Sequence, residues 1–200
     1  MSAKARTIVS RYFDLTDDVY LEGRWELGHP RDTQGVKLDN PWQFRMGKPS
    51  SWLERVRVPV KIPGTALDYS HAAFSIPVVT SRVASIFERL APNDVQLFPV
   101  DIEGQPDDFF ILNAIRRVNC IDDEASEEAR YWTPGNGIAE KVGTYISVWG
   151  MRIDTSRLGS ARVFRPLHWE VALVIPEDIK LALEAIGATG VQFKDVSPLR

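Results

Sequence analysis

The sequence predicts an α+β fold in which a mixed β-sheet carries two similar strand–helix–strand units and an irregular N-terminal region covers one edge or face. Two observations lead to this prediction. Apolar residues recur at helical spacing in two places, each between strand-like runs, and prolines and glycines crowd the chain before them. We therefore expect a single domain over residues 1–200, with a Trp-, Pro- and Gly-rich part at 1–66 and an α/β core at 75–196.

Composition indicates a folded protein without disulfides. Of the 200 residues, 44% are hydrophobic and 26% are charged, and six Trp and nine Phe supply material for a core. The one cysteine, Cys120, cannot form an internal disulfide, which is typical of a reducing compartment. A pI near 5.7 argues against a protein that binds nucleic acid through bulk positive charge.

No part of the sequence predicts a membrane or secretory segment. No run approaches the roughly 18 apolar residues of a membrane-spanning helix. The opening stretch MSAKARTIVSRYFDL lacks the apolar core of a signal peptide. We expect a cytoplasmic protein.

The part before Ala66 is predicted to be irregular, with short strands at RYFDL and VYLEG. Because proline fixes φ and cannot donate to a strand ladder, the proline-rich stretch excludes long helices and central strands. This part also holds Trp25, Trp42 and Trp52. Two readings of these tryptophans stay open: an ordered cover packed on the core, or an aromatic binding surface.

The first regular unit begins with a strand at SIPVV. Val83, Ile86, Phe87 and Leu90 then fall on one helix face, and Thr80 or Ser81 is a suitable N-cap. The next strands are predicted at VQLFPVDIEG and at DFFILNAIRRVNCI, the latter long or bent, and further strands at GTYISVWGMRI and ARVFRP.

The second unit is predicted to begin with a strand at WEVALVI, which places Trp169, Val171, Leu173 and Ile175 on one face. Pro176 suits the first turn of the following helix, whose apolar face comprises Ile179, Ala182, Leu183 and Ile186. Gly187 is expected to end this helix in a left-handed conformation, before a last strand at VQFKDV.

The two units also align with each other. A shift of 96 residues lays segment 78–100 over 174–196 without a gap, so that Val83 meets Ile179 and Gln96 meets Gln192. We interpret this as an internal repeat, with convergence on a common β-α-β pattern as the alternative.

No catalytic motif is present, and we expect no cofactor. Asp68, Ser70 and His71 supply the residue types of a catalytic triad, but a loop-stabilising or core role for the histidine is the better interpretation. Cys120 precedes a run of acids, which disfavours a thiolate, so we expect a buried small side chain.

The segment IDDEASEE gathers five carboxylates within seven residues, although the chain has a formal charge of only −3. These are Asp122, Asp123, Glu124, Glu127 and Glu128. One reading is that Asp122 or Asp123 caps a short helix. Another is a charged patch for a basic partner. The segment lacks the ligand spacing of a calcium loop, so we expect no metal site.

The order of SRVASIFERL, VQLFPV, FFILNAIRRVNCIDDEAS and ALVIPEDIKLALEAIGATGVQF resembles immunity protein family 11 of bacterial polymorphic toxin systems, also described as domain of unknown function 1629. The resemblance covers roughly 75–196. It implies a non-enzymatic protein that is made beside a toxin and neutralises it in the producing cell. It assigns no catalytic residues.

The leading hypothesis is therefore an immunity protein that occludes a cognate toxin domain, with the five acids or the three tryptophans as its contact residues. If the acidic segment contributes, the toxin surface should be basic, as in many nucleases. Two alternatives stay open: an enzyme of unrecognised type with a pocket between the N-terminal region and the sheet, and a scaffold that self-associates through exposed aromatics. The oligomeric state is left open.

Overall fold

The computed structural model describes residues 11–199, which form two main sheets, three two-stranded pairs and two α-helices. The largest sheet has five strands in the order β3 (Val56–Val58), β7 (Val95–Ile102), β8 (Phe109–Ala114), β6 (Ile76–Thr80) and β5 (Tyr69–Ala72). The second sheet has the order β13 (Val174–Pro176), β1 (Tyr12–Asp17) and β14 (Val191–Asp195).

The remaining elements are short, apart from the helices. The strand pairs are β10 (Glu128–Tyr131) with β11 (Tyr145–Trp149), β9 (Arg117–Val118) with β12 (Arg165–Pro166), and β2 (Glu26–Leu27) with β4 (Val60–Ile62). The α-helices are α1 (Ser81–Leu90) and α2 (Glu177–Ala185), and the 3₁₀ helices are η1 (Pro41–Arg45), η2 (Ala73–Ser75), η3 (Pro134–Asn136), η4 (Ala139–Lys141) and η5 (Thr155–Arg157).

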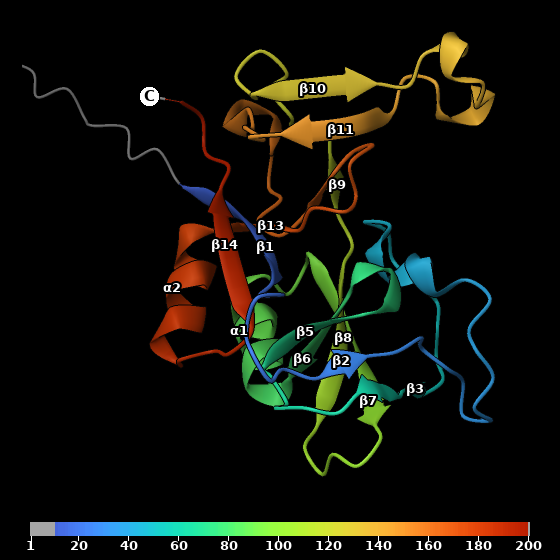
Figure 1. Cartoon of the computed structure of the whole chain (residues 1–200). Coiled ribbons are helices and arrows are strands. Elements are labelled where there is room, and N and C mark those ends of the chain that lie inside the picture. Colours follow the sequence, from blue (N-terminus) through green and yellow to red (C-terminus); the bar gives the residue numbers. More distant parts are fainter. Residues whose placement is uncertain (1–10, 200) are drawn as a thin grey trace, which may run out of the picture.

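The α+β prediction is confirmed, and both helices lie together on one side of the molecule (Figure 1). Their predicted apolar faces meet in one core. This core joins α1 and α2 to one face of the five-stranded sheet and to β1, through side chains that include Phe87, Leu183, Leu112 and Leu15. Strand β8 alternates, so its even-numbered residues from Phe110 face this core.

The opposite face of the five-stranded sheet is covered by the irregular part of the chain, as predicted. A second core there joins Val78, Val100 and Ile111 of the sheet to Trp25 and Phe44 of the irregular part. The covering side chains are nearly inaccessible, since Trp25 is 1% exposed and Phe44 is 0% exposed. Burial of aromatic area therefore holds the irregular part against this face, and β3 adds regular strand pairing with β7 at the edge of the sheet.

Strand β1 confirms the strand predicted at RYFDL, but it forms part of a sheet and does not cover one. It lies in the centre of the three-stranded sheet, antiparallel to both β13 and β14. The predicted strand at VYLEG is wrong. The chain turns there, because the Asp18 carboxylate accepts a hydrogen bond from the Tyr20 backbone N–H at 3.0 Å.

The two predicted strand–helix–strand units have the same arrangement in space. In each, the two strands are parallel and separated by one antiparallel strand: β8 lies between β6 and β7, and β1 lies between β13 and β14. The helices of the two units contact each other. The descent of segments 78–100 and 174–196 from a duplication stays a prediction, as does the single-domain organisation.

The helix ends follow the prediction in part. Gly187 has a φ of +61° and ends α2, with its N–H donating to Glu184 O at 2.9 Å. Thr80 is the N-cap residue of α1, but its hydroxyl does not cap the helix. It donates instead to the Asp68 carboxylate at 3.0 Å, so a tertiary contact replaces the local one.

The predicted strand at 169–175 is mostly wrong, and a buried arginine explains the difference. Arg165 is 1% exposed, and its Nη1 donates to the carbonyl oxygens of Glu170, Val171 and Ala172 at 3.1, 3.4 and 3.1 Å. These three carbonyl oxygens all point to the same guanidinium nitrogen, so they do not accept hydrogen bonds from a neighbouring strand. Burial lowers the pKa of Arg165 to about 10. Val171 is consequently half exposed rather than on a shared apolar face.

Candidate functional site

The acidic segment forms a tight turn rather than the short helix that capping would serve. The Asp122 carboxylate accepts from the Ala125 backbone N–H at 3.1 Å, and the Asp122 carbonyl accepts from the Ser126 backbone N–H and hydroxyl at 3.0 and 2.7 Å. Asp122 therefore caps the turn, and the turn leads directly into β10.

Asp123 joins this turn to the hairpin that follows it. Its two carboxylate oxygens accept hydrogen bonds from the hydroxyls of Tyr131 and Tyr145, at 2.6 and 2.8 Å. The two rings stack at 4.4 Å between centroids. Burial raises the pKa of both phenols, and the hydrogen bonds to Asp123 raise it further. Asp123 thus holds the hairpin rather than facing a partner freely.

The last three acids differ in how they are held. Glu128 accepts from Arg130 Nε and Ser147 Oγ, both at 3.0 Å, across the β10–β11 pair. The Glu127 side chain lies against Gly150, where an added Cβ would come within 2.4 Å of its carboxyl carbon. Glu124 and Glu127 are exposed, and neither takes part in an ion pair within residues 11–199.

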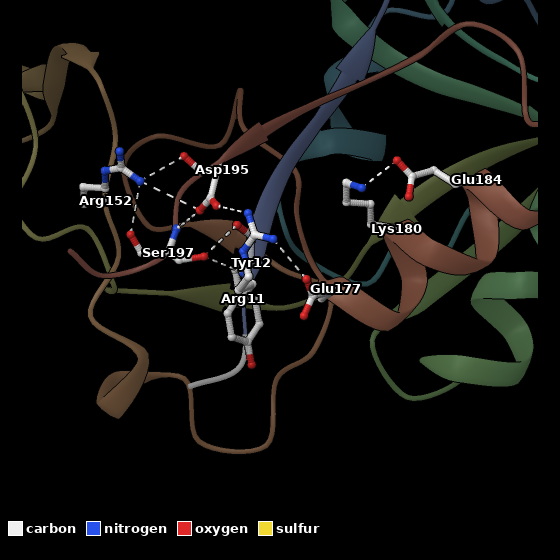
Figure 2. Close-up of polar contacts among 8 residues, drawn as sticks. All are labelled: Arg11, Tyr12, Arg152, Glu177, Lys180, Glu184, Asp195 and Ser197. Carbon is white, nitrogen blue, oxygen red and sulfur yellow. Dashed lines mark hydrogen bonds and ion pairs between the residues drawn. The ribbon is translucent and has the colours of Figure 1, made fainter. Parts of the chain in front are cut away.

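The turn and the hairpin are tied to the body of the protein through Arg152. Its backbone N–H donates to Ser126 Oγ at 3.0 Å, and its guanidinium Nη1 donates to the carbonyl oxygens of Asp195 and Ser197, both at 3.3 Å. Figure 2 shows this guanidinium beside Asp195, whose carboxylate also binds Arg11 at 2.6 Å. Although burial opposes it, the Arg11 contact lowers the pKa of Asp195 to about 2.

The three tryptophans proposed from the sequence do not form one surface. Trp25 is 1% exposed and donates from Nε1 to Ser70 Oγ at 2.7 Å, so it belongs to the core and is unavailable to a partner. Trp52 is half-buried against Phe44, and its Nε1 donates to Glu54 O at 2.7 Å. Trp42 is 42% exposed and packs edge-on against Phe74.

A fourth tryptophan, missed in the sequence, is more exposed than these. Trp149 ends β11 and is 63% exposed. Within residues 11–199 it takes part in no aromatic pair, although the other exposed tryptophan, Trp42, does. The alternation in YISVW offered a signal, since it places Trp149 on the same strand face as the polar Ser147.

Asp68, Ser70 and His71 do not form a triad. Asp68 binds Arg82 and Thr189, whereas Ser70 binds Trp25. His71 Nδ1 lies 2.9 Å from Asp17 Oδ1 instead. Although burial alone would raise the pKa of Asp17, its hydrogen bonds with His71 and Arg24 hold that pKa well below the ordinary value. The structural interpretation of His71 therefore fits its contacts.

Cys120 is fully buried, and burial raises the pKa of its thiol to about 12. We expect a thiol reagent such as Ellman's reagent to leave the folded protein unmodified near neutral pH and to react once per chain after addition of denaturant. Absorbance of the released thiolate measures this. Rapid modification without denaturant, in protein shown to be folded by circular dichroism, would contradict the burial.

Similarity to a known protein family indicates the function of this chain. The sequence profile of the immunity protein family Imm11 matches residues 3–198. The chain belongs to the Imm11 family. The match extends the resemblance seen at 75–196 across the irregular part as well. No curated protein matches the chain. Membership of an immunity family implies a toxin-neutralising role and a cognate toxin as partner.

The Imm11 chain also has a hollow where the enzymatic alternative would need one. A space of about 610 Å³ lies between the irregular part and the β3–β7 edge of the sheet. Arg31, Arg57, Asp101 and Glu103 line it, and Asp101 pairs with Arg55. The lining residues include no serine, cysteine or histidine. The hollow therefore offers charges of both signs but no side-chain nucleophile of those types.

Between residues 11 and 199, no three His, Cys, Asp or Glu side chains are placed to hold a metal ion together. In the same range, neither helix has the length and apolar content that crossing a bilayer requires.

Proposed function

We propose that this Imm11 protein is a non-catalytic antidote that acts in the cytoplasm of the producing cell. It binds the toxin domain made beside it and occludes that domain's active site or a motion the toxin needs. The observation that carries the proposal is the Imm11 match over residues 3–198. The contacts within the described chain are consistent with it, because the polar groups that resemble catalytic sets are engaged in structural hydrogen bonds.

The proposal is tested by protection and by stoichiometry. Cells that carry the neighbouring toxin under an inducible promoter should resume growth when this protein is co-produced. The purified toxin and the full chain should elute together from a size-exclusion column. Absence of both protection and complex, with each protein shown to be folded, would overturn the proposal.

A titration separates occlusion from the enzymatic alternative. Occlusion requires one antidote molecule for each toxin molecule, so residual toxin activity should fall linearly and reach its minimum at equimolar protein. An enzyme that modifies the toxin or its product would protect well below equimolar amounts. Self-association of the chain alone on the same column would support the scaffold alternative.

A further inference from the structure

The strand pair β10–β11 forms a ribbon that projects from the body, above the three-stranded sheet in Figure 1. Neither strand has a second neighbour in its sheet within the described chain. One face of the ribbon packs inward, through Ala129, Val148 and, beyond a shift in the strand register, Tyr145. The register places Glu128 opposite Trp149 and Arg130 opposite Ser147, so these four side chains share the outward face.

Trp149 is the exposed apolar anchor of this face. An exposed indole that rests on no other ring is costly to leave in water, and tryptophan is enriched among the residues that dominate binding energy at interfaces. Glu128 lies directly opposite it, and the Glu127 side chain lies against the next residue, Gly150. Glu128 is therefore the cross-strand neighbour of the ring, and Glu127 lies one residue further along the ribbon.

Charge separates this ribbon from the rest of the chain. Residues 122–149 contain six acidic and two basic side chains, a formal charge of −4, whereas the whole chain has −3 and the remainder therefore has +1. Within the ribbon, Arg130 is already engaged by Glu128 and Ser147, while Glu124 and Glu127 are left without ion pairs in the described structure. The net negative charge of the protein thus falls within the acidic turn and the ribbon that carries Trp149.

We propose that the outward face of the β10–β11 ribbon, with Trp149 as its exposed anchor and the exposed Glu124 and Glu127 in the adjoining turn, docks onto a basic patch of the toxin. A lysine or arginine of that patch stacks on the indole, where a cation–π contact and the nearby carboxylates act together. This inference rests on the proposed function, and it names the surface and the charge of the partner. Asp122, Asp123 and Glu128 hold the turn and the ribbon through hydrogen bonds, so the proposed contact is tested without changing them.

The test compares two exposed tryptophans in the full chain. Binding of the neighbouring toxin domain is measured by isothermal titration calorimetry for the wild type, Trp149→Ala and Trp42→Ala. We expect Trp149→Ala to raise the dissociation constant by about 30-fold, which is the size of a hot-spot truncation. We expect Trp42→Ala, at a side chain that is 42% exposed but belongs to η1 and packs on Phe74, to change it by less than about threefold.

A second variant tests the charge without touching the ring. Glu124→Gln and Glu127→Gln together leave the hydrogen bonds of Asp122, Asp123 and Glu128 intact. Stopped-flow measurement should show a lower association rate constant and a flatter dependence of that rate on salt, because steering by exposed charge is screened by ions. Thermal unfolding of each variant establishes that the fold is kept.

The outcomes distinguish this inference from the function beneath it. If the wild type does not bind the toxin, the proposed function fails and the inference fails with it. If the wild type binds and Trp149→Ala binds equally well, the ribbon is not the docking face, while the antidote function stands. If neither salt nor the Glu124/Glu127 variant changes the association rate constant, the proposal of a basic toxin surface is overturned.

Discussion

Asp68→Asn should lower the free energy of unfolding by about 3 kcal/mol, as expected when a buried, hydrogen-bonded carboxylate is removed. Asp68 is 7% exposed, and its two oxygens accept from Arg82 and from the hydroxyls of Thr80 and Thr189, at 3.0 and 2.8 Å for the hydroxyls. The Thr189 backbone N–H adds a further bond at 2.8 Å. This one side chain therefore links the start of α1 to the turn between α2 and β14.

Urea unfolding measures the effect, and a second ion pair supplies the control. Asp101 pairs with Arg55, but both side chains are about half exposed, at 49% and 50%. Asp101→Asn should therefore cost less than about 1 kcal/mol. Equal losses for the two variants would show that Asp68 does not have the linking role that its contacts indicate.

The Asp68 contribution should also depend on pH. Although burial alone would raise its pKa, hydrogen bonds from Arg82, Thr189 and Thr80 hold the pKa of Asp68 well below its ordinary value of 3.8. A carboxyl group whose folded pKa is depressed stabilises the fold above its unfolded pKa and loses that contribution as pH falls towards the folded pKa. The stability difference between wild type and Asp68→Asn should thus shrink below about pH 4.

Gly190→Ala should lower the free energy of unfolding by about 3 kcal/mol, because a left-handed backbone and a backbone clash combine. Gly190 has a φ of +78°, and an added Cβ would lie 2.3 Å from Tyr69 O and 2.9 Å from Leu67 Cδ1. Relief of that clash requires the turn to move away from β5. The Tyr69 N–H bond to Thr189 O, at 3.1 Å, would be lost with it.

Gly187→Ala is the matched control for this variant. Gly187 has a similar φ of +61°, but an added Cβ would meet nothing within 4 Å. It should therefore cost only the left-handed conformation, about 1 kcal/mol. Chemical denaturation of both variants isolates the contact with Tyr69 as the difference between them, and equal losses would argue against a close approach at Gly190.

Elements with a strong local period could be predicted from the sequence, and those set by distant partners could not. The spacing of Val83, Ile86 and Phe87 requires only one helix face and one core. By contrast, the strand expected at WEVALVI is replaced because Arg165 collects its carbonyl oxygens. That side chain belongs to β12 and gives no local signal of its target.

The candidate surface shows the same limit. The sequence gives the number of acidic residues in the segment but does not tell which of them form hydrogen bonds. In the structure, Tyr131 and Tyr145 donate to Asp123, and Arg130 donates to Glu128. Among the tryptophans, Trp25 lies in an irregular stretch, where the sequence is compatible with a cover and with a binding surface. It is buried because that stretch covers a whole sheet face, and only the packed structure decides this.

The central position of β1 has a consequence for how the protein is made. On the ribosome, β1 emerges about 160 residues before β13 and β14, which are its only neighbours in the three-stranded sheet. Synthesis of that span takes roughly 8 to 32 seconds at about 5 to 20 residues per second. Throughout this time Phe13 and Leu15 lack the strands that cover them, and the sheet forms only after a long loop has closed. Among the strands described over residues 11–199, the first to be translated is therefore among the last to be paired. An interrupted translation product lacks this sheet, however much of the five-stranded sheet it contains.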